Sequence, residues 1–230
     1  MQSRSESRSV FNHRFQLWLL AGVVVVAASF WLDATVDAAL DVTAIPAWKR
    51  VAWWCSKLGE GWVIAVWGIA VALAFVFARR PRLAAAVFHV ALASLLIGLV
   101  ATILRVLFGR TRPLNHDVPQ GFYGPWHDGH WLVGKFMFSA FPSGHAATAV
   151  GLLAAAWLVN RRWAALALVY ALAVSWSRIA LQCHHLSDVL ASTVLAIAGA
   201  VLLQAWLHPL VTSTFENLHR KLFSQERVNH

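Results

Sequence analysis

The chain has 230 residues, of which 59% are hydrophobic and 13% charged, and its mean hydropathy is +0.61. Soluble domains contain about 45–50% apolar residues, so this composition excludes an ordinary soluble domain and indicates a protein of the bilayer. The formal net charge is +9. It does not indicate a nucleic-acid-binding protein, because the basic residues lie in twos and threes between hydrophobic segments and form no long basic stripe.

Several hydrophobic segments approach the ~20 residues that a helix needs to cross a bilayer. They are residues 15–34, 61–79, 83–107, 146–160, 163–182 and 186–207. We therefore predict an all-α, polytopic integral membrane protein, in which residues 1–230 form a single bundle of six transmembrane helices between tails at 1–14 and 209–230. The first segment is too long for the apolar region of a signal peptide and has no small-residue cleavage site, so we expect it to be retained.

Two further segments lie outside these spans. Residues 46–58 mix three tryptophans with lysine and arginine, which predicts an interfacial helix between the first two spans, with aromatic anchors at headgroup level. An ordinary connecting loop is the alternative. The residues after Pro209 are polar, which predicts a short surface helix or a frayed end.

The positions of lysine and arginine predict the orientation of the spans. With six spans, both termini share one side of the membrane. That side would hold Arg4, Arg8, Arg14, Arg79, Arg80, Arg82, Arg161, Arg162, Arg220, Lys221 and Arg227. Because cytoplasmic loops carry an excess of basic residues, we expect both termini to be cytoplasmic. The opposite ends of the helices then face the periplasm or the cell exterior.

The first polar cluster within the apolar part of the chain is Arg105-x6-Arg112-Pro113. Arg105 and Arg112 are seven residues apart, which is two turns along one helical face, so both are expected to point into one cavity before Pro113 ends the helix. Either arginine alone would be assigned to snorkelling at the membrane surface. Arg110 lies off this face and is expected to contact headgroups or solvent.

The second cluster is Pro142-Ser143-Gly144-His145, directly before an apolar run. It is therefore expected at the start of a helix, where exposed N–H groups and the helix dipole favour an anion and Gly144 permits close backbone approach. Ser143 in isolation would simply cap the helix. His145 adds a titratable donor beside the expected anion site.

The third cluster is Ser177-Arg178, followed by His184-x3-Asp188. If the second part is helical, Asp188 can reach the His184 ring, decide which ring nitrogen carries the proton, and leave the other as a nucleophile. A structural polar pair is the alternative. The neighbouring His185 is a weaker candidate for the nucleophile, and we expect it to contact solvent or to support the site from behind.

In this order the clusters resemble the three signature motifs of the type-2 phosphatidic acid phosphatase superfamily, which includes bacterial lipid phosphatases, glucose-6-phosphatase and vanadium haloperoxidases. The resemblance covers roughly residues 100–190. One position departs from the family pattern, because Arg105 stands where a lysine is usual. A guanidinium also binds phosphate, but its reach differs from that of an ammonium group.

The resemblance implies a phosphoryl transfer that uses no metal and no other cofactor. By that resemblance His184 attacks phosphorus to form a phosphohistidine, Asp188 orients His184, and His145 protonates the departing oxygen. Water then cleaves the intermediate. The remaining site residues would hold the phosphoryl oxygens; they are Arg105, Arg112 and Arg178, with the backbone amides around Ser143 and Gly144.

The loop of residues 114–140 is rich in aromatic residues, which suits a lid, a groove for lipid entry, or simple interfacial anchoring. Its potential metal ligands are His116, Asp117, His127, Asp128 and His130, but they have no recognised metal-binding spacing. Cys55 and Cys183 also lack such spacing. We interpret the two cysteines as small buried hydrophobic residues, with a disulfide as the open alternative.

These patterns predict an integral membrane phosphatase that acts on lipid phosphates or diphosphates at the outer leaflet of a bacterial inner membrane. Its partners would be the bilayer and the lipid substrate. Candidate substrates are undecaprenyl diphosphate, phosphatidylglycerol phosphate, phosphatidic acid and the phosphates of lipid A. A lipid-to-lipid phosphotransferase with the same site is a second hypothesis. A membrane protein that binds anionic lipid without catalysis is a third.

Overall fold

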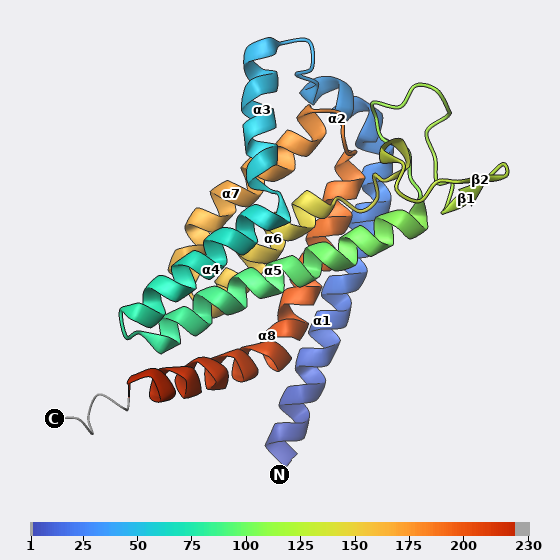
Figure 1. The fold of residues 1–230 in the computed structure, drawn as a ribbon. Coiled ribbons are helices and arrows are strands. Elements are labelled where there is room, and N and C mark those ends of the chain that lie inside the picture. The colour runs from blue at the N-terminus through green and yellow to red at the C-terminus, as the bar shows by residue number, and fades with distance from the viewer. Residues whose placement is uncertain (1, 224–230) are drawn as a thin grey trace.

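The computed structural model describes residues 2–223, which are mostly helical (Figure 1). The first half contains α1 (Gln2–Ser29), the 3-10 helix η1 (Phe30–Leu32), α2 (Asp33–Leu40), α3 (Pro46–Leu58), α4 (Gly61–Phe77) and α5 (Pro81–Phe108). A long loop follows, with strands β1 (Trp126–His127) and β2 (His130–Trp131) and the 3-10 helix η2 (Phe136–Phe138). The chain then forms α6 (Gly144–Val159), α7 (Arg161–Ala180) and α8 (Leu186–Phe223).

The centre of the bundle is formed by α5, α6 and α8, which all pack against one another. Helix α7 packs on α6, α4 on α5, α3 on α7 and α1 on α8. Small side chains let these helices approach closely: a Cβ on Gly98 of α5 would lie 2.3 Å from Thr148 Oγ1 of α6. Ser94 Oγ also donates to the Thr148 carbonyl at 2.7 Å. Such contacts are typical of helices that associate in lipid, where apolar surface alone gives little driving force.

Each predicted span falls on a helix, but the structure does not establish that six helices cross a membrane. Within residues 2–223, four helical segments are long and apolar enough to do so: His13–Leu40, Pro81–Phe108, Arg161–Ala180 and Leu186–Leu222. Helices α3 and α4 are joined at an angle of 55° and would form a fifth span if they are counted together. Helix α6 is apolar but shorter.

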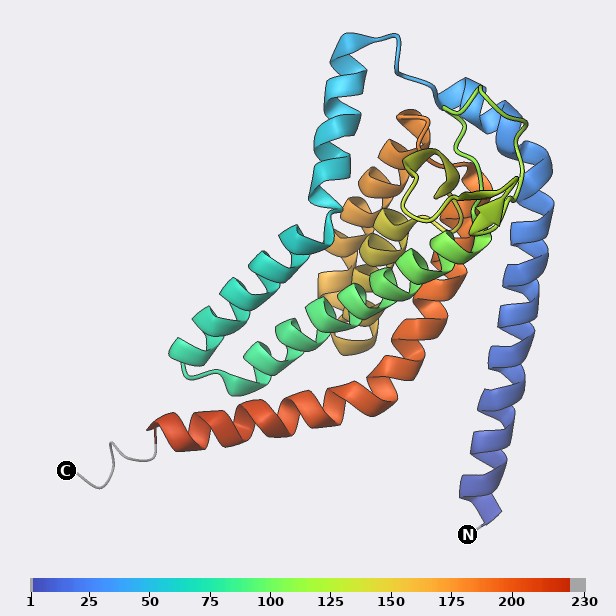
Figure 2. The same ribbon diagram turned by 45° about the vertical axis from the view of Figure 1, so that its right-hand side comes forward.

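Residues 46–58 form α3, so this segment is a helix and not an irregular connecting loop. Whether it lies at the membrane interface stays a prediction. The last helix differs from expectation, because α8 continues through Pro209 to Phe223 instead of ending near residue 207. Figure 2 shows that α8 bends along its length, which we attribute to Pro209, since proline cannot donate the backbone hydrogen bond of the helix.

Helix α5 ends at Phe108, earlier than the expected stop at Pro113. Gly109 adopts a left-handed φ of +58° and donates its N–H to the Arg105 carbonyl at 3.2 Å. Any Cβ at this position would lie 2.0 Å from the Gly124 carbonyl oxygen, so glycine is required by both the backbone angle and the space. Arg112 therefore lies in the loop after the helix.

The loop after α5, helix α2 and the first turns of α6 and α8 gather at one end of the bundle (Figures 1 and 2). The N-terminus, the turn between α4 and α5 and the end of α8 lie toward the opposite end. The hairpin of β1 and β2 projects from the first end, with Trp126 paired to Trp131 and His127 to His130. This arrangement brings all three polar clusters of the sequence to one end of the helices.

Candidate active site

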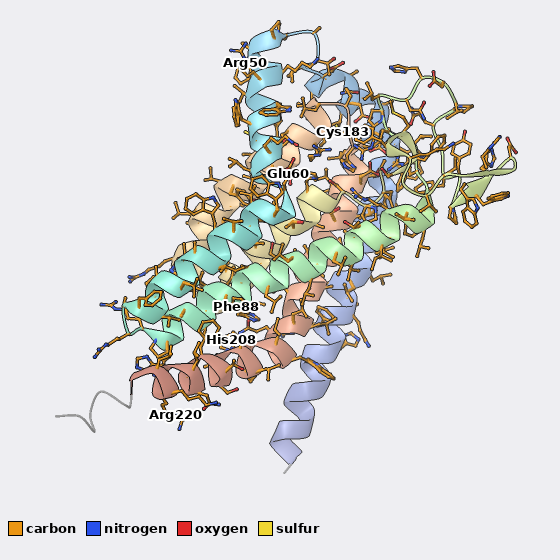
Figure 3. The ribbon with its side chains drawn as sticks, in the orientation of Figure 1. Arg50, Glu60, Phe88, Cys183, His208 and Arg220 are labelled. Atoms are coloured by element: carbon orange, nitrogen blue, oxygen red, sulfur yellow. The ribbon has the colours of Figure 1, made fainter. Side chains whose placement is uncertain are left out.

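The predicted site residues come from four helices and two loops at this end of the bundle. Arg105 is in the last turn of α5 and Arg112 is in the loop that follows. Ser143 caps α6, and Gly144 and His145 begin it; Arg178 lies near the end of α7, and Asp188 in the first turn of α8. His184 lies between these last two helices. Figure 3 shows its neighbour Cys183 at this end and Arg220 at the other.

His184 is fully buried, and its two ring nitrogens have different surroundings. Nδ1 lies 2.6 Å from the Ala140 carbonyl oxygen. Because a carbonyl only accepts, Nδ1 must carry the proton, and Nε2 is left with a lone pair. Nε2 has no hydrogen-bond partner among the described residues. The ring is thus held in the form that a nucleophile at Nε2 requires.

The expected partner of the His184 ring was Asp188, and the structure corrects this detail. Asp188 Oδ2 lies 3.6 Å from His184 Nδ1, which is close enough for charge interaction but too long for a hydrogen bond. The carboxylate instead accepts the His185 backbone N–H at 2.8 Å. The helical spacing did predict the approach of the two residues, but it could not reveal the competing carbonyl of Ala140, which comes from a distant loop.

Arg112 is 2% exposed and is held by the loop around η2. Its Nε donates to the Phe136 carbonyl at 2.7 Å, and Nη2 donates to Ser139 O and Oγ, both at 3.3 Å. The guanidinium lies 3.6 Å from the centre of the Phe136 ring. The remaining nitrogen, Nη1, has no partner in the described part of the chain.

Arg178 is also buried, and α3 supplies its partner. Its Nη1 donates to Ser56 Oγ, while its Nε is buried and has no partner within residues 2–223. Arg105 approaches from α5: its Nη1 lies 3.6 Å from the place that a Cβ on Gly144 would occupy. His145 lies beside the break between α3 and α4, where a Cβ on Gly59 would be 3.3 Å from His145 Cδ2.

Buried positive charge dominates the electrostatics of the site. The pKa of Arg112 falls to about 10, chiefly because its guanidinium is buried; nearby Cys183 opposes this shift, and the charges of Arg178 and Arg105 add to it. Burial also lowers the pKa of His184 well below its ordinary value, and Arg112, Arg178 and His145 lower it further. His184 is therefore neutral at physiological pH. Buried guanidinium groups with no carboxylate partner are costly, and an anion would offset that cost.

The turn before α6 is held in two directions. Ser143 Oγ accepts the Ala146 N–H at 3.4 Å, which caps the helix. The Ser143 N–H donates to the Asp188 carbonyl at 3.3 Å, so this amide is engaged within the protein and is not directed at a ligand. Gly144 is the first residue of α6, where an N–H has no acceptor inside the helix. Of the two amides expected to bind phosphate, the Gly144 amide is therefore the better placed.

The structure overturns the expectation for Arg110 and decides between the two alternatives for His185, which supports the site and does not contact solvent. Arg110 does not contact headgroups or solvent: it is 6% exposed, and its guanidinium lies 2.5 Å from Asp188 Oδ1 and 2.8 Å from Asp33 Oδ2. The helical-face argument failed because the helix ends before Arg110. His185 is likewise shielded from solvent, with Nδ1 2.6 Å from Asp37 Oδ2.

Asp33 and Asp37 of α2 were missed by the sequence analysis, although a signal was present. Two carboxylates four residues apart near the end of an apolar span are expensive unless they find partners, and they share one helical face. The sequence therefore indicates that Asp33 and Asp37 bind basic residues, and the motifs supply such residues. By contrast, no sequence pattern indicates that the Ala140 carbonyl binds His184.

The aromatic loop offers little to a metal ion. His127 Nε2 lies 3.2 Å from Asp128 Oδ2, and both side chains are well exposed. In the part of the chain that the structure describes, no three His, Cys, Asp or Glu side chains are grouped as metal ligands. Cys55 and Cys183 are separate thiols, each partly exposed.

Fold and site together define a mostly helical, multi-pass membrane protein with a buried cluster of Arg112, Arg178 and His184 at one end, which we call the pocket. A sequence model of the PAP2 superfamily matches residues 86–211, more than half of the chain, and the chain belongs to this superfamily. The relationship expected from the three motifs is thereby confirmed. A search of curated proteins by sequence gives no match.

Two solved structures share the fold. The first transmembrane PAP2 type phosphatidylglycerolphosphate phosphatase from Bacillus subtilis has a TM-score of 0.59 at 19% identity, covering 84% of this chain and 94% of that chain. LpxE of Aquifex aeolicus has a TM-score of 0.55 at 19% identity, covering 76% of this chain and 96% of that chain. At this identity the likeness concerns the fold.

Proposed function

We propose that this protein is a membrane lipid phosphatase that hydrolyses a lipid phosphate or diphosphate through a phosphohistidine at His184, without a metal ion. One observation carries the proposal. Among the described residues, His184 Nε2, Arg112 Nη1 and Arg178 Nε are buried without hydrogen-bond partners, and both arginines lie close enough to His184 for their charges to lower its pKa. A nucleophile and donors for phosphoryl oxygens are thus provided together.

The arginines bind the phosphoryl group. Even with its pKa lowered to about 10, Arg112 keeps its charge at neutral pH. Arg112 Nη1 and Arg178 Nε donate to phosphoryl oxygens, and Arg105 approaches from α5 with the Gly144 amide beside it. Donors fixed in advance stabilise the charge of the transition state without reorganisation, which is the main source of catalysis in phosphoryl transfer.

The chemistry proceeds in two displacements. His145 takes up a proton together with the anionic substrate, whose charge offsets that of the arginines. His184 Nε2 attacks phosphorus, the bond from phosphorus to the lipid oxygen breaks, and His145 gives this proton to that oxygen. The Ala140 carbonyl holds the Nδ1 proton, and Asp188, 3.6 Å away, stabilises the positive ring. Water, deprotonated by His145, then attacks phosphorus and breaks the P–N bond. Inorganic phosphate is released and neutral His184 is regenerated.

The surroundings of the site suit an amphiphilic substrate. The pocket lies at one end of an apolar helical bundle, and the loop beside it carries aromatic side chains that are half exposed or more: Phe122, Trp126, Trp131 and Phe136. Aromatic residues are typical of the headgroup region of a membrane. A substrate tail can therefore stay in lipid while its phosphate enters the pocket. Undecaprenyl diphosphate, phosphatidylglycerol phosphate, phosphatidic acid and lipid A phosphates all have this form.

The charge distribution supports a site on the periplasmic or outer face of a bacterial inner membrane. The turn between α4 and α5 carries Arg79, Arg80 and Arg82, and the turn between α6 and α7 carries Arg161 and Arg162. Both turns lie at the ends of helices away from the pocket. Under the rule that basic turns stay in the cytoplasm, the termini are cytoplasmic and the pocket faces outward.

The test is a phosphate-release assay on purified protein in mixed micelles, with the four lipid classes side by side and with or without a chelator. We expect release from at least one lipid, unchanged by the chelator and inhibited by vanadate, which mimics the five-coordinate transition state. His184→Ala should abolish release. The matched control is His130→Ala, an exposed histidine of the hairpin, which should retain it.

Three results would overturn the proposal. They are a requirement for an added metal ion, retention of activity by His184→Ala, and absence of release from every lipid phosphate tested. Transfer of labelled phosphate to a second lipid in preference to water would identify a phosphotransferase instead.

A further inference from the structure

We propose that Arg110 is a positioning residue for catalysis, which acts on His184 through Asp188 and ties the N-terminal helix pair α1–α2 to the active site. The inference rests on the proposed function, because it concerns how the nucleophile of that reaction is held. Arg110 lies between two motif residues and only two positions before Arg112, but it has a different environment from the arginines of the pocket.

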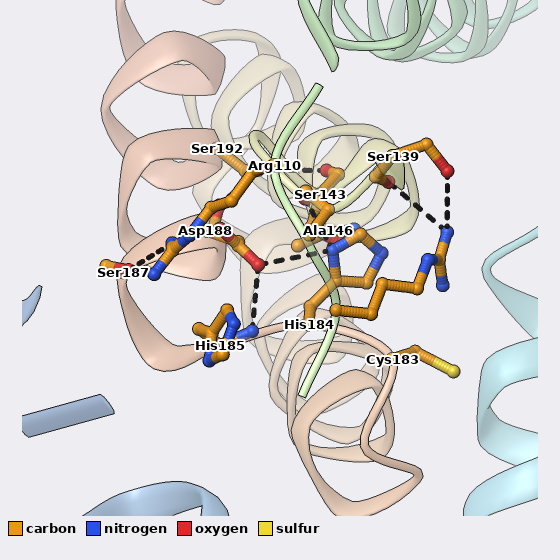
Figure 4. A network of polar contacts seen from close by, with 12 residues as sticks. Arg110, Ser139, Ser143, Ala146, Cys183, His184, His185, Ser187, Asp188 and Ser192 are labelled. Carbon is orange, nitrogen blue, oxygen red and sulfur yellow. Dashed lines mark hydrogen bonds and ion pairs between the residues drawn. The ribbon is translucent and has the colours of Figure 1, made fainter. Parts of the chain in front are cut away.

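The terminal nitrogens of Arg110 are directed at carboxylates. Nη1 donates to Asp188 Oδ1 at 2.5 Å, and Nη2 donates to Asp33 Oδ2 at 2.8 Å (Figure 4 shows the Asp188 side of this network). A guanidinium engaged in this way has no terminal nitrogen to offer a phosphate. Arg110 therefore contacts Asp188, which lies beside His184, and does not itself contact the phosphate.

Helix α2 fixes the position of Arg110. Asp33 Oδ1 accepts the Ser187 N–H at 2.9 Å, and Asp33 Oδ2 accepts the Ser187 hydroxyl at 2.6 Å. Arg110 Nη1 also lies 2.6 Å from Ser187 Oγ. Asp33, Ser187 and Arg110 thus form a closed set of hydrogen bonds that joins α2, the loop after α5 and the start of α8.

Aromatic rings cover this set. The guanidinium carbon of Arg110 lies 4.5 Å from the centre of the Phe30 ring, 5.2 Å from that of Phe122 and 5.9 Å from that of Phe141. The rings keep water away from the ion pairs and strengthen them, since charges attract more strongly where the local dielectric constant is low. The geometry of Asp188 is therefore rigidly defined.

Two routes lead from Arg110 to the nucleophile. Through the side chain, Arg110 holds Asp188, whose Oδ2 binds the His185 N–H at 2.8 Å and lies 3.6 Å from His184 Nδ1. Through the main chain, the Arg110 carbonyl accepts the Ala140 N–H at 3.0 Å, and the Ala140 carbonyl accepts from His184 Nδ1. A substitution of the Arg110 side chain removes the first route and leaves the second.

The experiment is a double-mutant cycle on the full-length protein, with the lipid phosphate that gives the highest wild-type activity. The variants are Arg110→Gln, Asp188→Asn and the two combined, with Arg82→Gln as the matched control, an exposed arginine at the far end of the bundle. We expect Arg110→Gln to lower kcat by about 10²-fold, the size of loss caused by a nucleophile displaced by about 1 Å. KM should change much less, because the phosphate-binding arginines remain.

The decisive comparison is between the kcat of the double variant and that of Asp188→Asn. If Arg110 acts through Asp188, the double variant is no slower than Asp188→Asn alone. If the two losses multiply, or if Arg110→Gln keeps its wild-type kcat, the inference is overturned. An inactive wild-type protein would instead contradict the proposed function, so the two failures are distinguishable.

Two further variants keep the test valid if Arg110→Gln does not fold. Asp33→Asn keeps Arg110 and Asp188 but removes the charge that anchors the guanidinium, and it should lower kcat by about 10-fold with KM nearly unchanged. Arg110→Lys keeps the charge but cannot bind both carboxylates in one plane, and its kcat should lie between those of Arg110→Gln and wild type. Wild-type kcat in Asp33→Asn would overturn the role given to α2.

Discussion

Arg110 and Arg112 are separated by one residue, and their surroundings are opposite. Arg110 is bound by two carboxylates and covered by aromatic rings, whereas Arg112 is held by carbonyl and hydroxyl oxygens and keeps a buried nitrogen without a partner in the described structure. Both are almost fully buried. Burial alone therefore does not distinguish a binding residue from a supporting one.

The difference lies in where the compensating negative charge comes from. The protein supplies it to Arg110 through Asp33 and Asp188, so this region is complete without a ligand. At Arg112 and Arg178 no carboxylate of the described residues accepts a hydrogen bond, and only the charge of Glu60 acts on Arg178, so a bound anion would add the missing compensation. A satisfied network and a group of unsatisfied cations thus lie side by side, and in the proposed mechanism the first holds the nucleophile of the second.

The strongest test of this division compares the adjacent histidines. His184→Asn should lower kcat by about 10⁶-fold, the size of loss found when the nucleophile of a serine protease is removed. His185→Asn should lose far less, because His185 pairs with Asp37 and does not belong to the unsatisfied pocket. Phosphate release in single-turnover conditions measures both. Similar losses in the two variants would contradict the division.

Thermal stability separates the two arginines. Arg110→Gln leaves two buried carboxylates without their cation, and breaking such a pair costs about 3–5 kcal/mol, or roughly 6–20 °C in Tm for a chain of this size. Arg112→Gln removes a buried charge that has no counter-ion, so we expect a change of less than about 1 kcal/mol. Unfolding in detergent, followed by circular dichroism, measures both. A larger loss of Tm in Arg112→Gln would reverse the assignment.

The pH dependence of stability tests the buried, neutral His184. Its pKa in the folded protein is lowered, so below about pH 6.5 the unfolded chain takes up a proton that the folded protein does not. Stability should therefore be constant above that pH and fall by up to about 1.4 kcal/mol for each pH unit below it. Tm measured between pH 7.5 and 5.5 should depend less steeply on pH in His184→Asn. An identical slope would show that His184 is not held neutral.

The smallest effect is expected far from the pocket. Arg82 and Glu216 form an ion pair of 3.3 Å, in which the Arg82 side chain is 87% exposed. Exposed pairs contribute little, so Arg82→Gln should change stability by less than about 0.5 kcal/mol and leave phosphate release unchanged. Comparison with Arg110→Gln then shows how much more an ion-paired arginine contributes to stability when it is buried than when it is exposed.

The sequence predicted the helices well because each depends on a long apolar run, and Pro81, Ser143 and Asn160 mark helix starts by their local chemistry. It predicted less well where a contact from elsewhere decides. The end of α5 depends on Gly109 meeting Gly124, and the extension of α8 past Pro209 overrides the usual effect of proline. Neither could be read from a hydrophobic pattern.

The candidate site shows the same limit. The motif spacing predicted that arginines and histidines from distant segments would meet, and the structure brings them to one end of the bundle. The spacing could not show that Ala140 binds the His184 ring or that Arg110 turns inward, because both depend on the course of the loop between α5 and α6. Helical periodicity predicted that Arg110 faces away from the site, and this was wrong because Arg110 lies beyond the end of α5.

The connection between Asp33 and Arg110 has a consequence for how the chain is made. Asp33 is followed 77 residues later by Arg110, so at about 5–20 residues per second the ribosome needs about 4–15 s to supply the cation. Throughout that interval the nascent segment of α1 and α2 carries Asp33 and Asp37 without the counter-charge of Arg110. We therefore expect this segment to stay in water or beside the translocation machinery until Arg110 emerges, and a polypeptide truncated before α8 lacks Asp188 and with it the second carboxylate of the network.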